Sequence, residues 1–444
     1  MDCAAEQGRI PSTLAIVGLG YVGLPLAVAF AKHVSVIGFD INKELIQNYQ
    51  NAIDPTGEVG SEELMQVLRS SCVKFTSNPD DLRQANFFII AVPTPVALDH
   101  TPDLSLLENA CNIVGHYMPQ NSIVVFESTV YPGITEGVCL PLLEKASRFV
   151  SGRDFTVGYS PERINPGDKT HHLNNIVKIV SGQTAETRKR IADTYSMIIE
   201  QIYEVSSIKV AEATKVIENT QRDVNIAFAN EIAILLHKMG IDSGEVFRAM
   251  STKWNALNFR PGLVGGHCIG VDPYYLLQGA QRLDQPMPLI TNSRQINNYI
   301  PSFIVNELIR IACSLGKSVS SMKVAVLGIT FKENCPDIRN SRAIDLINEL
   351  YNYGISPVVS DPFVNTDAIK SERRITLTPI DKISDLDCLI IAVSHQQFRE
   401  FSLAKLISFF QTSSSDARIL MDIKGVYWCE RKQLVDENFI YWSL

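Results

Sequence analysis

Residues 13–23 read TLAIVGLGYVG, and residues 34–40 read VSVIGFD. The apolar runs at 13–17 and 34–39 are predicted to be strands, because short apolar runs that end at glycine or a polar residue are typical of buried strands. Between them, residues 24–32 are apolar enough for a buried helix that opens at the glycines. A strand, a glycine turn, a helix and a second strand are the repeating unit of a doubly wound parallel sheet.

The glycine turn has the spacing of a dinucleotide-binding loop. Gly18 permits the tight turn, Gly20 lets the backbone approach a pyrophosphate, and Gly23 allows close packing of helix on strand. The start of the helix supplies unpaired N–H groups for the phosphates. Asp40 stands 22 residues after Gly18, where a carboxylate binds ribose hydroxyls and repels a 2′-phosphate. The pattern predicts NAD rather than NADP, and the alternative is a tight turn that binds no nucleotide.

The rest of the chain divides into two further parts. Residues 208–239 contain no proline or glycine and carry apolar residues at helical spacing. They are predicted to form one helix, about 48 Å long at 1.5 Å per residue, which suits a spine between two domains and would end at Gly240. After residue 316 the strand–helix alternation returns, with apolar runs at 323–327, 357–360 and 388–393. The predicted fold is α/β: two Rossmann-like, doubly wound parallel-sheet domains joined by a long central helix and a helical middle domain. The predicted domains are residues 1–205, which bind the dinucleotide, 206–318, which are helical and carry a cysteine loop, and 319–444, which are Rossmann-like.

Composition limits the functions open to this chain of 444 residues. It has 40 basic and 48 acidic residues, so the net charge of −8 gives no reason to bind nucleic acid or an anionic membrane. No apolar run reaches the roughly 20 residues of a membrane-spanning helix, and residues 1–12 lack the pattern of a secretion signal. The nine cysteines form no Cys-x-x-Cys pair, and their odd number and wide spacing argue against a disulfide framework. We therefore expect a cytoplasmic protein without a metal site.

Residues 265–273, GGHCIGVDP, are the most unusual segment. The glycines around Cys268 leave its thiol accessible to a substrate, although a lone cysteine is more often a small core residue. Asp272 follows four residues later and is placed to assist proton movement. Lys215 and Asn219 share one face of the predicted long helix. That face is either solvated or offers a cation and an amide to a developing oxyanion.

Three other segments place polar groups at strand ends, where ligands bind in α/β folds. They are VPTP at residues 92–95, ESTVYPG at 127–133 and YSPER at 159–163. Each is ambiguous by itself, since prolines also terminate strands. The second half has a single glycine in the corresponding turn, GITFK at 328–332, so it is predicted to bind something other than a dinucleotide, or nothing.

Together these segments resemble the UDP-glucose/GDP-mannose 6-dehydrogenase family over nearly the whole chain. The similarity rests on GLGYVG, VPTP, ESTVYPG, YSPERINPGD, KVAEATKVIENTQRD, FRPGLVGGHCIGVDPYY and GITFKENCPDIRNS. The last four resemble the branch that oxidises UDP-N-acetylhexosamines in Vi-antigen and O-antigen biosynthesis. The chain has His267 where UDP-glucose dehydrogenases have serine, and Pro166 where they have a second glutamate. These departures favour UDP-N-acetylglucosamine or UDP-N-acetylgalactosamine over UDP-glucose.

The resemblance implies a four-electron oxidation of a sugar's primary alcohol to a carboxylate, with two NAD molecules consumed in succession. Cys268 would trap the aldehyde as a thiohemiacetal and then carry the thioester that water releases. Lys215 and Asn219 would stabilise the alkoxide and oxyanion states. Glu162 would assist hydrolysis, and Thr129 would hold a water. The implied catalytic residues are thus Cys268, Lys215, Asn219, Asp272, Glu162 and Thr129.

The resemblance also implies the binding residues. Those expected to contact NAD are Gly18, Gly20, Tyr21, Val22, Gly23, Asp40, Thr94 and Arg339. Those expected to contact the UDP-sugar are Arg163, Phe259, Arg260, Gly262 and Lys332. Arginine and lysine suit this site because a UDP-sugar carries a diphosphate. In the family, the C-terminal domain holds the nucleotide part of the UDP-sugar and the long helix packs in a dimer, so a homodimer or higher homo-oligomer is expected.

Two functions of other kinds stay open at this point. A two-electron β-hydroxyacid dehydrogenase also joins a Rossmann unit to a long helix, but it would use a lysine without a thiol. A non-catalytic regulator would bind NAD without turnover and would leave Cys268 amid glycines unexplained.

Overall fold

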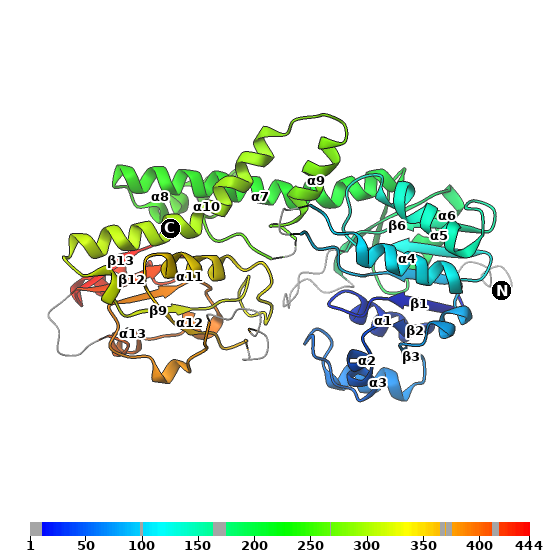
Figure 1. The fold of residues 1–444 in the computed structure, drawn as a ribbon, viewed down its shortest axis with the longest axis horizontal. Helices are drawn as coiled ribbons and strands as arrows, with labels where there is room; N and C mark the ends of the chain where they lie inside the picture. The colour runs from blue at the N-terminus through cyan, green and yellow to red at the C-terminus, as the bar shows by residue number, and fades with distance from the viewer. Residues whose placement is uncertain are drawn as a thin grey trace. The chain divides into compact units, whose positions relative to one another are not determined.

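The computed structural model describes residues 11–97, 101–162, 175–266, 268–364, 369, 375–410 and 417–444. The chain divides into two compact units, and Figure 1 labels many of their helices and strands. Unit 1 comprises Met1–Glu218 and Tyr274–Gln285, and unit 2 comprises Asn219–Pro273 and Pro286–Leu444. The division into three domains made from the sequence stays a prediction.

Unit 1 is built on a sheet that has eight strands among the described residues, in the order β3-β2-β1-β4-β5-β6-β7-β8. The strands are β1 (Thr13–Val17), β2 (Ser35–Phe39), β3 (Val73–Thr76), β4 (Phe87–Ile90), β5 (Ser122–Phe126), β6 (Phe155–Tyr159), β7 (Val177–Gly182) and β8 (Gln201–Glu204). The order reverses between β1 and β4, which confirms the doubly wound fold. The strands are parallel, except that β6 and β7 run antiparallel. The apolar pattern of a strand does not encode its direction, so the sequence did not reveal this exception.

Helices follow most strands of unit 1. They are α1 (Gly23–Ala31), α2 (Lys43–Gln50), α3 (Ser61–Arg69), α4 (Ser105–Tyr117), α5 (Leu140–Ser147), α6 (Ala185–Tyr195) and α9 (Asp272–Gln281), with the short helices η1 (Pro79–Gln84) and η2 (Thr135–Cys139). The first two residues of α9 belong to unit 2 and the rest to unit 1. Leu14 and Ile16 of β1 pack with Leu24 and Phe30 in one apolar core, while Ala15 of the same strand is buried on the opposite face. Burial on both faces explains why the strands read as continuous apolar runs.

Unit 2 contains a parallel sheet with five strands in the described part of the chain, in the order β10-β9-β11-β12-β13. The strands are β9 (Val324–Leu327), β10 (Val358–Ser360), β11 (Cys388–Ile391), β12 (Arg418–Asp422) and β13 (Phe439–Trp442). The helices are α8 (Ser243–Ser251), α10 (Pro288–Ser314), α11 (Arg342–Asn352), α12 (Gln396–Arg399), α13 (Leu403–Ser408) and α14 (Arg431–Asp436), with η4 (Val319–Ser321) and η5 (Ile380–Lys382). The second Rossmann-like domain is thereby confirmed.

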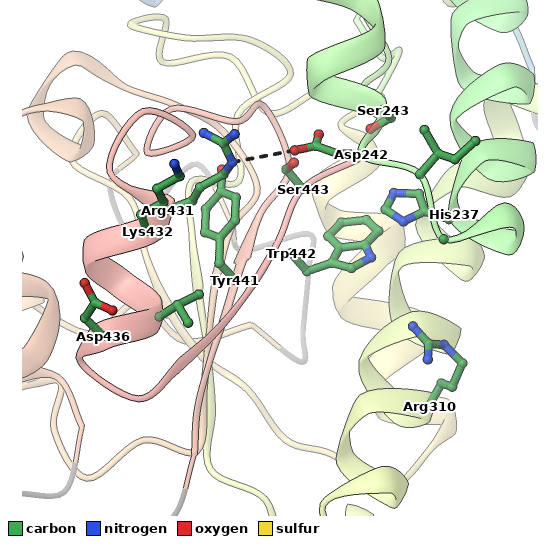
Figure 2. Close-up of a pocket in the computed structure, with 13 residues that line it drawn as sticks. His237, Asp242, Ser243, Arg310, Arg431, Lys432, Asp436, Tyr441, Trp442 and Ser443 are labelled. Carbon is green, nitrogen blue, oxygen red and sulfur yellow. Dashed lines mark ion pairs between the residues drawn. The ribbon is translucent and has the colours of Figure 1, made fainter.

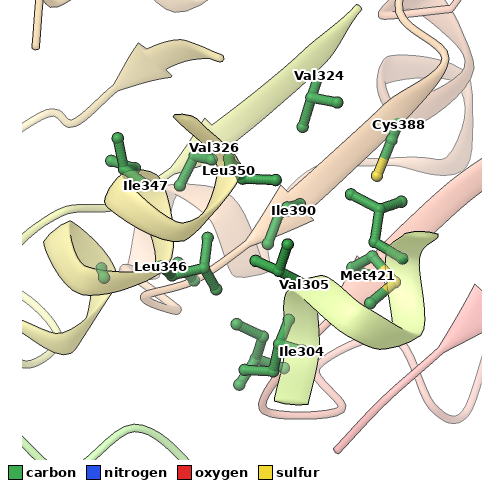
Figure 3. Close-up of a cluster of buried hydrophobic side chains, with 14 of the residues drawn as sticks. Ile304, Val305, Val324, Val326, Leu346, Ile347, Leu350, Cys388, Ile390 and Met421 are labelled. Carbon is green, nitrogen blue, oxygen red and sulfur yellow. The ribbon is translucent and has the colours of Figure 1, made fainter. Parts of the chain in front are cut away.

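Two apolar cores cover the two faces of this sheet. Val324 and Val326 of β9 pack with Ile304 of α10 and Leu346 of α11 on one face, as Figure 3 shows. Ala325 and Leu327 of the same strand pack on the other face, against side chains of α12, α13 and α14. The alternation follows from the period of two in a strand.

Helix α7 (Ile208–Met239) has the bounds predicted from the sequence. Its first eleven residues belong to unit 1 and the rest to unit 2. Gly240 follows with a φ of 71° and donates its N–H to the carbonyl oxygen of His237, which is a common way to end a helix. Within the described residues, no helix has the length and apolar character needed to cross a membrane.

Candidate functional site

The glycine loop of unit 1 has the geometry that its sequence predicts. Gly18 has a φ of 92°, a conformation that glycine adopts without strain. A Cβ on Gly23 would lie 1.8 Å from the carbonyl oxygen of Gly18, so no larger residue fits there. A Cβ on Gly20 would meet no atom within 4 Å. The loop is therefore closed where helix packs on strand and open where a pyrophosphate would approach.

Asp40 lies beside this loop at the end of β2. One carboxylate oxygen accepts the N–H of Leu19 and the other accepts the N–H of Asn42, both at 2.9 Å. A carboxylate has about four acceptor positions, so capacity remains for two ribose hydroxyls. Tyr21 and Val22 are half-buried in the same turn. These residues fit the NAD site predicted for them.

The loops that follow β4 and β5 are joined to each other. The hydroxyl of Thr94 donates to the carbonyl oxygen of Thr129 at 2.7 Å, and Tyr275 of α9 donates to the carbonyl oxygen of Thr94 at 2.9 Å. Further along the second loop, Glu212 of α7 accepts the N–H of Gly133 at 2.6 Å. The structure thus brings Thr94 and Thr129 together at the carboxyl edge of the sheet.

Glu162 lies at the same edge, after β6, and both its side chain and its main chain are held by lysines. Its carboxylate contacts Lys178 of β7 at 2.9 Å, and its carbonyl oxygen accepts from Lys215 of α7 at 2.8 Å. Lys178 also contacts Glu127 at 2.9 Å. Burial raises the pKa of Glu127 to about 8, against the opposing effect of Lys178. Three predicted residues, Thr129, Glu162 and Lys215, therefore lie in one unit with two charged residues that the sequence did not single out.

In unit 2, Cys268 is exposed in a turn held from both sides. Its carbonyl oxygen accepts the N–H of Asp272 at 2.9 Å, and Asp272 accepts from the amide of Asn219 at 2.5 Å. Asn340 binds Gly266 twice: its carbonyl oxygen accepts the Gly266 N–H at 3.1 Å, and its side-chain amide donates to the Gly266 carbonyl oxygen at 2.9 Å. Cys268 is exposed, as the sequence predicts. Asp272, four residues further on, forms a buried pair with Asn219 of α7.

The glycines of this turn are required by close contacts. A Cβ on Gly265 would lie 2.4 Å from the carbonyl oxygen of Asn340, and one on Gly266 would lie 2.5 Å from the ring of Phe331. Gly266 also has a φ of 81°. The turn can approach the 331–340 segment this closely only because it lacks side chains.

The segment predicted to bind the UDP-sugar is anchored by a buried asparagine. Asn230 of α7 accepts the N–H of Gly262 at 2.8 Å and donates to its carbonyl oxygen at 3.1 Å. Phe259 is half-buried, and Arg260 is exposed and donates to the hydroxyl of Ser251 at 2.7 Å. A Cβ on Gly262 would lie 2.8 Å from the ammonium nitrogen of Lys424. Lys424, which the sequence did not indicate as a site residue, therefore lies against this segment.

The loop after β9 carries two further predicted residues. Lys332 is half-buried, and Arg339 is exposed and pairs with Asp337 at 2.6 Å. His395 accepts the N–H of Asn334 at 2.9 Å and thereby holds the loop near Lys332. Arg163, Pro166 and His267 lie outside the described residues.

Comparisons with known proteins agree with this geometry. Residues 12–205 match the NAD binding domain of the UDP-glucose/GDP-mannose dehydrogenase family, residues 209–299 its central domain and residues 325–428 its UDP binding domain. The chain belongs to this family.

Individual relatives cover nearly the full length of the dehydrogenase. It is 47% identical to the protein CapL of Staphylococcus aureus over 93% of this chain and 96% of CapL. It is 46% identical to the UDP-N-acetyl-D-glucosamine 6-dehydrogenase of Salmonella typhi over 95% of this chain and 98% of that protein. A solved UDP-D-ManNAc dehydrogenase from Pyrococcus horikoshii superposes with a TM-score of 0.85 at 30% identity, covering 97% of this chain and 98% of that one. The family confirms an NAD-dependent oxidoreductase with a UDP-sugar substrate.

The sequence positions of some further residues of the dehydrogenase indicate buried polar groups. Lys178 interrupts the apolar run IVKIV, where a charged residue facing the core needs a partner. Glu127 directly follows the buried strand IVVF, and Asn230 is a polar residue within the apolar stripe of α7. Asn340 had no such signal, because its contact with Gly266 spans 74 residues.

A separate hollow of about 710 Å³ lies in unit 2 and is shown in Figure 2. His237 stacks on Trp442 with ring centroids 5.0 Å apart, and Arg431 pairs with Asp242 at 3.6 Å. None of the predicted site residues lines this hollow. The described residues also contain no group of three or more potential metal ligands.

Proposed function

We propose that the protein oxidises the 6-hydroxymethyl group of a UDP-N-acetylhexosamine, UDP-N-acetylglucosamine or UDP-N-acetylgalactosamine, to the uronic acid for surface polysaccharide synthesis. The observation that carries the chemistry is the exposed thiol of Cys268, in a glycine turn fixed by Asp272 and Asn340. An exposed thiol in a rigid turn is the arrangement that a covalent intermediate needs.

The reaction balances as two two-electron steps and a hydrolysis. The alcohol first loses a hydride and a proton and becomes an aldehyde. The sulfur of Cys268 adds to the aldehyde carbon to give a thiohemiacetal, which loses a second hydride and proton to become a thioester. Water then adds to the thioester carbon, the C–S bond breaks with its electron pair returning to sulfur, and the carboxylate leaves. NAD, when bound, accepts each hydride.

The remaining residues act around this sequence. Lys215 and Asn219 stabilise negative charge that develops on the substrate oxygen, and Asp272, paired with Asn219, moves a proton. Glu162 removes a proton from the hydrolytic water, which Thr129 helps to hold. The Gly18–Gly23 loop and Asp40, with Thr94 and Arg339, bind NAD, and Arg163, Phe259, Arg260, Gly262 and Lys332 bind the UDP-sugar.

The identity of the sugar rests on the sequence. UDP-N-acetyl-D-glucosamine is the substrate in the name of the Salmonella typhi relative. His267 and Pro166, which depart from the UDP-glucose dehydrogenase pattern, support an N-acetylated sugar. UDP-glucose is the alternative substrate.

We also propose that the protein is a homodimer or a higher homo-oligomer. Phe228, Leu235 and Met239 of α7 are spaced so that they share one face, and each is more than half exposed. Trp254 and Leu257 in the same unit are 96% and 71% exposed. An exposed apolar stripe such as that on α7 is typical of an interface. A mass of two or more chains in light scattering would support self-association, and a single-chain mass would contradict it.

The substrate experiment incubates UDP-N-acetylglucosamine, UDP-N-acetylgalactosamine and UDP-glucose separately with NAD, and counts NADH per sugar consumed. Two NADH per N-acetylhexosamine are expected, and one per sugar would contradict the thioester route. Cys268→Ser should abolish turnover, whereas Cys313→Ser, at another exposed cysteine, should not. Turnover by Cys268→Ser at the normal rate would favour the β-hydroxyacid type of reaction.

A further inference from the structure

Unit 1 contains a buried charge cluster formed by Glu127, Glu162, Lys178 and Tyr195. The side chains of Lys178 and Glu127 have no exposed surface, and that of Glu162 is 7% exposed. The Lys178 ammonium nitrogen lies 2.9 Å from one oxygen of each glutamate. Tyr195 of α6 donates its hydroxyl to the other oxygen of Glu127. Of these four residues, only Glu162 has a role in the proposed reaction.

The antiparallel strand explains why the cluster lies at the site. Because β5 and β6 are parallel, Glu127 and Glu162 both leave the sheet at its carboxyl edge. Strand β7 runs the other way, so its beginning, with Lys178, lies at that edge. The register pairs Tyr159 with Ser181, and continued past the strand end it sets Glu162 opposite Lys178. A strand parallel to β6 would have put its first residues at the opposite edge.

The charges in the cluster do not balance. Two buried carboxylates contact the ammonium group of Lys178, and a second negative charge away from water is costly. Among the described residues, the titratable groups that act on Glu127 are Lys178, Glu162 and Tyr195. Burial and the neighbouring Glu162 raise the pKa of Glu127 to about 8, with Lys178 opposing them. Burial acts to lower the pKa of Lys178, but the two carboxylates outweigh it and raise that pKa, so the lysine stays charged.

We propose that Lys178 and Glu127 are positioning residues for Glu162 in thioester hydrolysis, a role that rests on the proposed function above. Lys178 holds the carboxylate of Glu162 in place, and its positive charge favours the ionised carboxylate over the neutral one. Glu127 is the carboxyl group that keeps a proton at neutral pH, which leaves the positive charge of Lys178 to Glu162. Lys215 completes the arrangement by fixing the main chain of Glu162 at 2.8 Å.

This role affects one step and spares the others. A general base must be ionised to take a proton from water, whereas the two oxidations that precede hydrolysis do not use Glu162. Removing the positive charge of Lys178 would take away the ammonium group that both buried carboxylates contact, and this favours the protonated forms of both. The enzyme would still form the thioester on Cys268 but would release it slowly.

The test compares Lys178→Met with the wild-type enzyme by rapid mixing with UDP-N-acetylhexosamine and excess NAD. We expect the first-turnover burst of NADH to persist within twofold, while steady-state turnover at pH 7 falls at least tenfold. Intact mass spectrometry of quenched samples should show the sugar adduct accumulating on Cys268. Hydrolysis by the variant should recover as the pH is raised above 8. Lys189→Met serves as the control, because Lys189 pairs with Asp193 on the exposed side of α6.

Glu127→Gln provides a second test of the proposal if Lys178→Met does not fold. In the wild type, ionisation of Glu127 near pH 8 adds negative charge beside Glu162 and makes it a stronger base, so hydrolysis should speed up through that pH. The glutamine variant should lose this inflection and keep its burst. A folded Lys178→Met enzyme with a normal steady state, or a Glu127→Gln enzyme that keeps the inflection, would overturn the proposal. Absence of the burst and the adduct in the wild type would instead refute the proposed function, and this proposal with it.

Discussion

The contact between Asn340 and the cysteine turn makes a measurable prediction. In Asn340→Gly the backbone keeps the left-handed conformation that Asn340 adopts, with a φ of 52°, and the carbonyl oxygen can still accept from Gly266. What disappears is the side-chain hydrogen bond of 2.9 Å to the Gly266 carbonyl oxygen. A bond of this kind contributes about 0.5–1.5 kcal/mol net.

If the energy of this hydrogen bond holds the turn, its loss lowers the fraction of molecules with Cys268 correctly placed about two- to tenfold. The range follows because 1.36 kcal/mol corresponds to a factor of ten. We therefore expect kcat to fall about two- to tenfold. The assay follows NADH at saturating substrates and, separately, the rate at which limiting iodoacetamide alkylates Cys268, which should also change.

The matched control is Asn121→Gly. Asn121 is an exposed asparagine in unit 1 with a φ of 64°, so the exchange has a similar effect on chain entropy and leaves the cysteine turn alone. Both variants should show similar small losses of thermal stability. If kcat and the alkylation rate of the two variants agree within error, the hydrogen bond from Asn340 to Gly266 does not place Cys268 and the reasoning fails.

Three other predictions concern unit 1. Gly23→Ala should fail to fold or should have a much lower Tm, because its Cβ would lie 1.8 Å from the Gly18 carbonyl oxygen. Gly20→Ala should keep a near-normal Tm and lose NAD affinity, and equal Tm values for the two variants would contradict the packing argument. Asp40→Asn should lower the ratio of the KM for NADP to the KM for NAD at least several-fold, because the substitution removes a charge that repels the 2′-phosphate. An unchanged ratio would show that the carboxylate does not face that phosphate. The raised pKa of Glu127 means that the folded state holds a proton that the unfolded state releases between about pH 4.5 and 8. Stability should therefore fall across that window by up to about 1.4 kcal/mol per pH unit, and denaturant titrations of Glu127→Gln should show a smaller slope than the wild type.

The parts of the site that depend on local geometry were predictable from the sequence. The roles of Gly18, Gly20 and Gly23 follow from the sterics of a turn that joins a strand to a helix, and such sterics are encoded within a few residues. The bounds of α7 followed from the absence of helix breakers over 32 residues. Family resemblance then supplied the chemistry of Cys268, which spacing alone left ambiguous.

The parts that depend on long-range pairing were not predictable in the same way. Lys178 reaches Glu162 because β7 is antiparallel, and strand direction leaves no trace in an apolar pattern. Asn340 meets Gly266, and Asn230 meets Gly262, across 74 and 32 residues of chain. Each of these contacts is a buried or half-buried polar pair, whose partner becomes evident only once the fold brings the two segments together.

The loop–acid arrangement of unit 1 recurs in unit 2. Gly328 has a φ of 86°, and Asp361 accepts the N–H of Ile329 at 2.7 Å, as Asp40 accepts that of Leu19. In the second copy, however, the same Asp361 oxygen also meets His395 at 3.1 Å, and both side chains are fully buried. The second acid is therefore sealed from any ribose, and each polypeptide should saturate at one equivalent of dinucleotide in equilibrium dialysis. An enzyme with one dinucleotide site must keep the half-oxidised sugar bound while the reduced dinucleotide leaves and an oxidised one takes its place.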